Sequence, residues 1–132
     1  MVLNNKLIQQ TIIMNKNICV LEDSEEILEL IHMVLEEDYN VYGFPTVSKF
    51  MSGYAKTNPD LCLLDVMLPD GSGLELCNEL KNNTLYKHIP IIIMTANAGI
   101  ERMKDDCLAD DFISKPFDID DLVRRIGIQI QN

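Results

Sequence analysis

The fold is decided by the stretch LCLLDVMLPDGSG, which spans residues 61–73. Its first four residues are apolar, as is typical of a strand buried on both faces of a parallel sheet. The apolar run stops at Asp65, and the segment after it, rich in proline and glycine, predicts a turn. A helical pattern follows, with one apolar face at Gly73, Leu76, Cys77 and Leu80. The stretch therefore predicts a strand, a turn and a helix, with an acid at the carboxyl end of the strand.

Short apolar runs of this kind recur along the chain, at residues 18–21, 41–44, 91–94 and 111–114. Each is followed by a stretch of helical period, and Ser24, Thr46 and Asp118 are placed to cap three of these helices. Five alternating strand–helix units predict an α/β fold, namely a doubly wound five-stranded parallel sheet with helices on both faces. Sheets of this kind bind ligands beyond the carboxyl ends of their strands.

Composition narrows the classes of function. The chain has 132 residues, with 11 Lys and Arg against 21 Asp and Glu, which gives a net charge of −10. Such an acidic chain is not expected to bind nucleic acid or an anionic membrane surface directly. The sequence shows neither the apolar run that a membrane span needs nor the pattern of a signal peptide, so we expect a cytoplasmic protein.

The chain is long enough for one domain. We expect residues 1–15 to form a leader outside the fold and residues 16–132 to form the domain. Because the sequence ends directly after the last helical pattern, we expect a stand-alone domain. The four cysteines lack metal-binding or redox spacing, and we interpret them as small, reduced core residues.

Polar side chains stand where the predicted strands end. Glu22 and Asp23 follow the first strand, Asp65 the third, Thr95 the fourth and Lys115 the fifth. Because parallel strands end at the same edge of a sheet, we expect these side chains to converge. Three carboxylates in one place repel one another, and a divalent cation with oxygen ligands, best Mg²⁺, would relieve this conflict.

This set of groups suits phosphoryl transfer. Asp65 stands alone at the end of a central strand and is the best candidate nucleophile. Glu22, Asp23 and Asp65 would bind Mg²⁺, with the backbone carbonyl of Met67 as a further ligand. The ammonium of Lys115 and the hydroxyl of Thr95 would donate hydrogen bonds to phosphoryl oxygens.

These residues together resemble a known family, the receiver domain of two-component response regulators. The resemblance covers about residues 16–130. It rests on Glu22-Asp23, on Asp65-Val66-Met67-Leu68-Pro69 with Gly73, on Thr95-Ala96 and on Lys115-Pro116-Phe117.

The resemblance implies a flavodoxin-like fold with strand order 2-1-3-4-5 and a cis peptide bond between Lys115 and Pro116. It also implies that Asp65 is the phosphoacceptor, that Thr95 is the switch hydroxyl and that Phe112 is the switch aromatic. The phosphoryl donor would be a histidine kinase or a histidine phosphotransfer protein. The output would be a changed surface on the fourth helix, fifth strand and fifth helix, recognised by a downstream protein that the sequence does not identify. Such a protein is not an enzyme beyond its own phosphorylation and dephosphorylation.

The segment between Thr95 and Lys115 is shorter than the family usually has, and its predicted helix at about 98–106 has little amphipathic character. Three alternatives stay open on the sequence: a pseudo-receiver that binds partners without being phosphorylated, a flavodoxin-like electron carrier and a phosphatase of the haloacid-dehalogenase type. The electron carrier would need a phosphate-binding loop where Glu22-Asp23-Ser24 stands, and the phosphatase would need an acid where Met67 stands.

Overall fold

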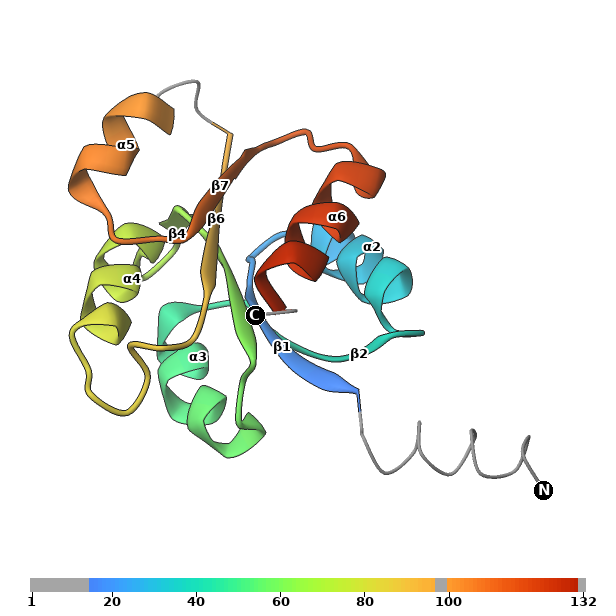
Figure 1. Cartoon of the computed structure of the whole chain (residues 1–132), viewed down its shortest axis with the longest axis horizontal. Coiled ribbons are helices and arrows are strands. Elements are labelled where there is room, and N and C mark those ends of the chain that lie inside the picture. Colours follow the sequence, from blue (N-terminus) through green and yellow to red (C-terminus); the bar gives the residue numbers. More distant parts are fainter. Residues whose placement is uncertain (1–14, 97–99, 131–132) are drawn as a thin grey trace.

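A single parallel sheet organises the molecule. The computed structural model describes residues 15–96 and 100–130, and five strands of this part form the sheet in the order β2-β1-β3-β6-β7 (Figure 1). They are β1 (Lys16–Leu21), β2 (Tyr39–Phe44), β3 (Leu61–Asp65), β6 (Ile91–Thr95) and β7 (Asp111–Ser114). Numbered along the chain, the strand order is 2-1-3-4-5, so the predicted α/β fold and its strand order are confirmed.

Helices cover both faces of this sheet. α3 (Val47–Gly53), α4 (Gly73–Lys81) and α5 (Ile100–Asp106) lie on one side, and α2 (Glu25–Leu35) and α6 (Ile119–Ile130) lie on the other (Figure 1). Within the described residues, no helix combines the length and the apolar character that crossing a membrane requires. β1 begins at Lys16, whereas residues 1–14 of the predicted leader lie outside the described part of the chain.

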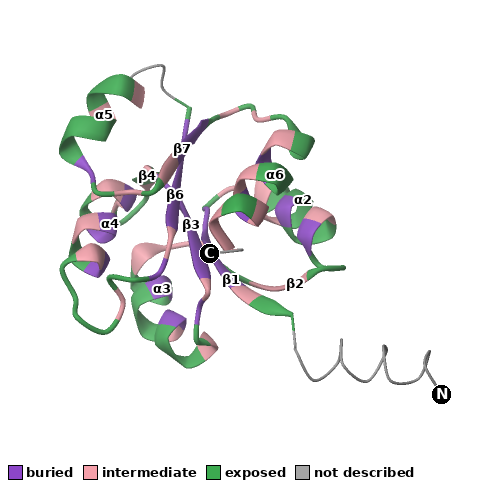
Figure 2. Cartoon of the chain, viewed as in Figure 1, coloured by how far each residue is buried: buried purple, intermediate pink, exposed green. Residues whose placement is uncertain are grey.

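The two faces of the strands bury different cores, because successive side chains of a strand point to opposite faces. In β3, Cys62 and Leu64 pack toward α3 and α4, whereas Leu61 and Leu63 pack toward α2 and α6. Figure 2 shows the buried central strands β3 and β6 between partly exposed helices. All five residues of β3 and of β6 are buried, in agreement with the run of four apolar residues with which each strand begins.

Side-chain caps begin the helices where the sequence predicted them. The hydroxyl of Ser24 accepts a hydrogen bond from the Ile27 amide at the start of α2, and that of Thr46 accepts one from the Lys49 amide at the start of α3. Asp118 Oδ1 accepts from the Asp120 amide at the start of α6. These contacts satisfy amides that the first helical turn leaves without a partner.

Two details differ from the sequence-based expectations. The segment after Asp65 forms a short antiparallel hairpin of β4 (Met67–Leu68) and β5 (Gly71–Ser72), where only a turn was predicted. The helical pattern at about residues 46–56 predicts one helix, whereas α3 ends at Gly53 and the chain continues as the 3₁₀ helix η1 (Tyr54–Thr57).

The last two helices bury few side chains. α5 buries none of its side chains, in line with its weak amphipathic pattern. The helical spacing of Ile119, Leu122, Val123 and Ile126 predicts one covered apolar stripe, but α6 buries only Leu122 and Ile126. Ile119 and Val123 are exposed because only the side chains that face the strands directly are covered.

Candidate functional site

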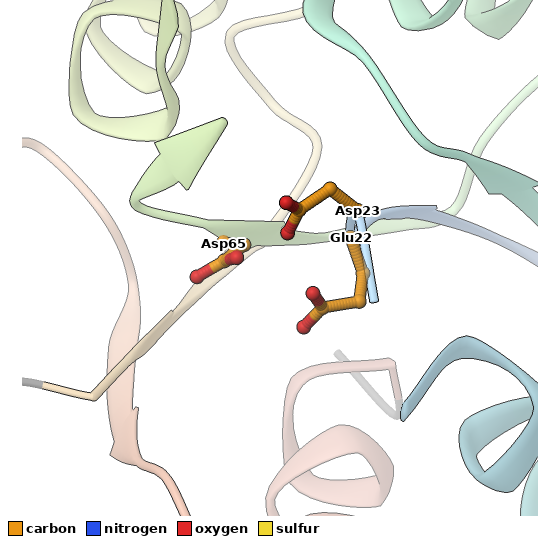
Figure 3. A group of neighbouring side chains, drawn as sticks. All are labelled: Glu22, Asp23 and Asp65. Carbon is orange, nitrogen blue, oxygen red and sulfur yellow. The ribbon is translucent and has the colours of Figure 1, made fainter. Parts of the chain in front are cut away.

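Three carboxylates meet at the carboxyl edge of the sheet. Glu22 and Asp23 directly follow β1, and Asp65 is the last residue of the neighbouring strand β3. One carboxylate oxygen from each lies within 4.8 Å of those of the other two. Figure 3 shows the three side chains side by side at the strand ends. Glu22 and Asp65 are buried, whereas Asp23 is exposed and faces solvent.

Backbone amides hold the two buried acids in place. Glu22 Oε2 accepts a hydrogen bond of 3.0 Å from the Ser24 amide, and Asp65 Oδ1 accepts one of 2.8 Å from the Val66 amide. In each case the second carboxylate oxygen remains to face the cluster.

A close backbone approach positions Asp65. The amide of Gly73, the first residue of α4, donates a hydrogen bond of 3.0 Å to the Val66 carbonyl. A Cβ atom at Gly73 would lie 1.9 Å from the carbonyl oxygen of Asp65, which is far inside van der Waals contact. Only glycine allows the helix to start this close to the end of β3.

Lys115 follows the edge strand β7 and brings a positively charged group to the cluster. Its amide donates a hydrogen bond of 2.7 Å to the carbonyl of Thr95, the last residue of β6. Its ammonium donates a hydrogen bond to Glu22 Oε1 and lies 3.3 Å from Asp65 Oδ2. The Lys115–Pro116 peptide bond is cis, as the family resemblance implied.

Burial shapes the electrostatics of Glu22. Loss of hydration raises the pKa of this carboxyl above its ordinary value, the Lys115 ammonium and the Ser24 amide work in the opposite direction, and the charge of Asp65 raises it further. The negative charge of Glu22 is therefore unfavourable in this buried position unless a cation lies near it.

The donor set fits a magnesium ion. Its members are oxygen atoms of three carboxylates, one of them exposed to solvent, and hard divalent cations prefer such ligands. Mg²⁺ binds few protein carboxylates and keeps several water molecules, which the exposed position of Asp23 permits. The residues present therefore match this cation.

Beside the acids lies an open pocket of about 420 Å³. Asp65, Thr95 and Lys115 line its polar side, and Val66, Met67, Ala96 and Met103 complete it. Thr95 itself is buried, at 2% exposure. The pocket leaves room beyond Asp65 for a group the size of a phosphoryl, with α5 at its border through Met103.

Phe112 lies on the strand that leads to Lys115. Phe112 pairs with Ile93 of β6. Its side chain is 7% exposed and packs in the core beneath α3, α4 and α5. The aromatic ring is therefore already directed inward in this structure.

Sequence reasoning placed every acid, hydroxyl and cation of the cluster at its strand end, and the structure brings all of them together. It missed the amides of Ser24 and Val66, which are backbone groups with no sequence signal of their own. It also missed Met103, which lines the pocket.

The comparisons with known proteins agree with this architecture. The family model of the response regulator receiver domain matches residues 18–127. The chain therefore belongs to the response regulator receiver domain family, whose members act in two-component systems. This assignment decides against the electron carrier and the phosphatase.

Among curated relatives, the phosphate regulon transcriptional regulatory protein PhoB of Escherichia coli is 38% identical over 120 residues, which cover 86% of this chain and 51% of PhoB. The chain thus spans about half the length of the curated relatives it matches. Among solved structures, the non-phosphorylated receiver domain of HemR from Leptospira biflexa has a TM-score of 0.79 and 32% identity, covering 89% of this chain and 96% of that one. A receiver domain protein from Methanospirillum hungatei has a TM-score of 0.80 and 27% identity, covering 89% and 95%. The named relatives are regulators rather than classical enzymes.

Proposed function

We propose that this protein accepts a phosphoryl group on Asp65 in a reaction that requires Mg²⁺. The observation that carries the proposal is the meeting of Glu22, Asp23 and Asp65 within 4.8 Å of one another beside the ammonium of Lys115. A carboxylate next to a pocket, with a cation in contact and further acids for a metal, is the arrangement that aspartyl phosphorylation needs.

Each side chain has a separate part in this reaction. Asp65 attacks the phosphorus atom with a carboxylate oxygen, and the bond between phosphorus and the donor's nitrogen breaks. Lys115 and the hydroxyl of Thr95 donate hydrogen bonds to the oxygens of the transferred group. Glu22, Asp23, Asp65 and the carbonyl of Met67 would hold the metal ion. When bound, Mg²⁺ supplies positive charge that neutralises the phosphoryl oxygens.

The donor would be a phosphohistidine of a histidine kinase or of a histidine phosphotransfer protein. Phosphorylation adds about 1.5–2 negative charges at Asp65, in the pocket that α5 borders through Met103. We propose that this charge draws Lys115 and Thr95 inward and alters the surface of α5, β7 and α6, which a downstream protein then recognises. Two features support this output surface: α5 buries none of its side chains, and Met103 of α5 lines the pocket.

The alternative is a pseudo-receiver that binds a partner without taking phosphate. The presence of all the polar groups at one sheet edge favours the phosphorylated receiver. The two functions differ in one measurable property, the covalent gain of a phosphoryl group.

The test is the intact mass of the protein after incubation with acetyl phosphate, with Mg²⁺ or with a chelator. We expect a gain of one phosphoryl group that depends on Mg²⁺ and is absent in Asp65→Asn. The matched control is Asp38→Asn, which changes an exposed acid at the opposite edge of the sheet and should leave the gain intact.

A phosphorylated Asp65→Asn variant would show that Asp65 is not the acceptor. No gain with acetyl phosphate would be followed by the same measurement with phosphorylated histidine kinases and histidine phosphotransfer proteins. No gain from any donor would replace the proposal by the pseudo-receiver.

A further inference from the structure

Two cysteine side chains meet away from the acidic cluster, between α4 and the segment that joins α5 to β7. Cys77 lies on the buried face of α4, and Cys107 is the first residue after α5. Both side chains belong to the same core cluster, and each thiol influences the acidity of the other. Cys77 is fully buried, whereas Cys107 retains 6% exposure beside Leu108, which is largely exposed.

A side-chain amide holds this contact independently of the thiols. Asn78, the neighbour of Cys77, donates from Nδ2 to the carbonyl of Asp106 at 2.9 Å, and its Oδ1 accepts from the amide of Leu108 at 3.1 Å. The backbone on both sides of Cys107 is therefore fixed against α4. These bonds keep Cys107 beside the turn of α4 that carries Cys77.

The two thiols differ in acidity. The hydrogen bond from Cys77 lowers the pKa of Cys107 to about 7, assisted by the amide of Ala109 and the charge of Lys81. The same contact and burial raise the pKa of Cys77. Cys107 is therefore the more acidic of the two thiols, and it is also the one nearer to solvent.

The other two cysteines provide an internal comparison. Cys19 and Cys62 face each other across the neighbouring strands β1 and β3, at 0% and 1% exposure. Helices cover them on the same side of the sheet, so an oxidant does not reach them while the sheet is intact. In both pairs the two cysteines lie near each other, but only the pair at α4 includes a cysteine that is more than 1% exposed, Cys107.

We propose that Cys77 and Cys107 form a reversible disulfide when the protein meets a hydroperoxide. The Cys107 thiolate attacks one peroxide oxygen, the O–O bond breaks, and Cys107 becomes a sulfenic acid while hydroxide leaves and takes up a proton. The sulfur of Cys77 then attacks the sulfenic sulfur, the S–O bond breaks, and the released hydroxide takes the Cys77 proton. With hydrogen peroxide, two thiols lose two electrons in total and two water molecules form.

The disulfide would tie the carboxyl-terminal end of α5 to α4. Because α5 buries none of its side chains, this bond adds a constraint that packing does not supply. The proposal concerns thiol chemistry alone and does not depend on phosphorylation of Asp65.

The test uses the full chain, reduced, freed of reductant and treated with hydrogen peroxide while folded. After alkylation of the remaining thiols, peptide mapping should show one Cys77–Cys107 crosslink and two alkylated cysteines, Cys19 and Cys62. The intact mass before alkylation should fall by about 2 Da, and dithiothreitol should restore it. The crosslink should persist in the control variant Cys19→Ala.

Two variants separate the steps. In Cys77→Ser, Cys107 should accumulate as the sulfenic acid and react with dimedone, whereas in Cys107→Ser, Cys77 should not react. Circular dichroism checks that both variants are folded, and the wild-type map stands without them. Four free thiols, a Cys19–Cys62 bond, a bond between chains or an uncrosslinked oxidised Cys107 in the wild type would each overturn the proposal.

Discussion

Lys115 Nζ lies 3.3 Å from Asp65 Oδ2, although the two residues end strands that are not neighbours in the sheet. The same ammonium donates a hydrogen bond to Glu22 Oε1. One cation thus contacts both buried acids of the cluster and leaves the exposed Asp23 to solvent. Within the described residues, no other ion pair involving Glu22 or Asp65 is formed. This relationship predicts that Lys115 contributes to stability as well as to the proposed phosphorylation.

Replacing Lys115 by methionine should therefore destabilise the protein in the absence of divalent cations. Removal of one partner from a buried ion pair costs about 3–5 kcal/mol. We expect a loss of this order in the free energy of unfolding, measured by urea denaturation with a chelator present, and partial recovery on addition of Mg²⁺. Lys49→Met, at an exposed position of α3, is the control and should change little. Equal stability of the two variants would contradict the importance of the contact.

Magnesium should stabilise the folded protein through the three acids. At 100 times its Kd, a cation that binds only the folded state adds about 2.7 kcal/mol to the free energy of unfolding. In Asp23→Asn, we expect a smaller gain at the same Mg²⁺ concentration. Without Mg²⁺ this variant should be slightly more stable than the wild type, because one of three repelling carboxylates is gone. Thermal unfolding at constant ionic strength measures both effects, and an equal Mg²⁺ response in the two proteins would exclude Asp23 as a ligand.

Two glycines offer a direct comparison of close contact with open space. In Gly73→Ala the new Cβ would lie 1.9 Å from the Asp65 carbonyl oxygen, so the start of α4 must shift. Overpacking of this kind costs about 1–3 kcal/mol, and it should also disturb Asp65. Gly127→Ala, within α6, places its Cβ where no atom lies within 4 Å and should stabilise the protein by about 1 kcal/mol. Denaturant unfolding of both variants checks the opposite signs.

Asp70 should make stability depend on pH in the acidic range. Its carboxylate accepts hydrogen bonds from the amides of Ser48 and Val47 at the start of α3, and these bonds lower its pKa below the ordinary value. A lowered pKa in the folded state means that the stabilisation is complete above the unfolded pKa, at about 4, and is lost as the pH falls through the folded value. The unfolding midpoint of Asp70→Asn should lie below that of the wild type near neutral pH and approach it in acid. A difference that stays constant with pH would show that the charge has no part in it.

The sequence predicted those features that depend on periodicity and on strand ends. The buried run before Asp65 indicated a central strand, and the acids, Thr95 and Lys115 could be placed because parallel strands end at one edge. Features that depend on contacts between segments far apart in the chain could not be predicted from the sequence. Asp70, between β4 and β5, accepts hydrogen bonds from the amides at the start of α3, and Met103 borders the pocket because of where α5 lies. The inward position of Phe112 likewise follows from the core around it.

Four adjacent strands, β1, β3, β6 and β7, position the acids, Thr95 and Lys115 at their carboxyl ends. In the sequence, Lys115 comes long after Glu22. During synthesis the acids leave the ribosome first and have no lysine to contact until β7 has been made and has joined the sheet. If any of these strands pairs out of register, its polar group lies away from the others and the cluster does not form. The cluster therefore exists only in a molecule in which these four strands have come together, so the proposed phosphorylation would report that this part of the sheet has assembled.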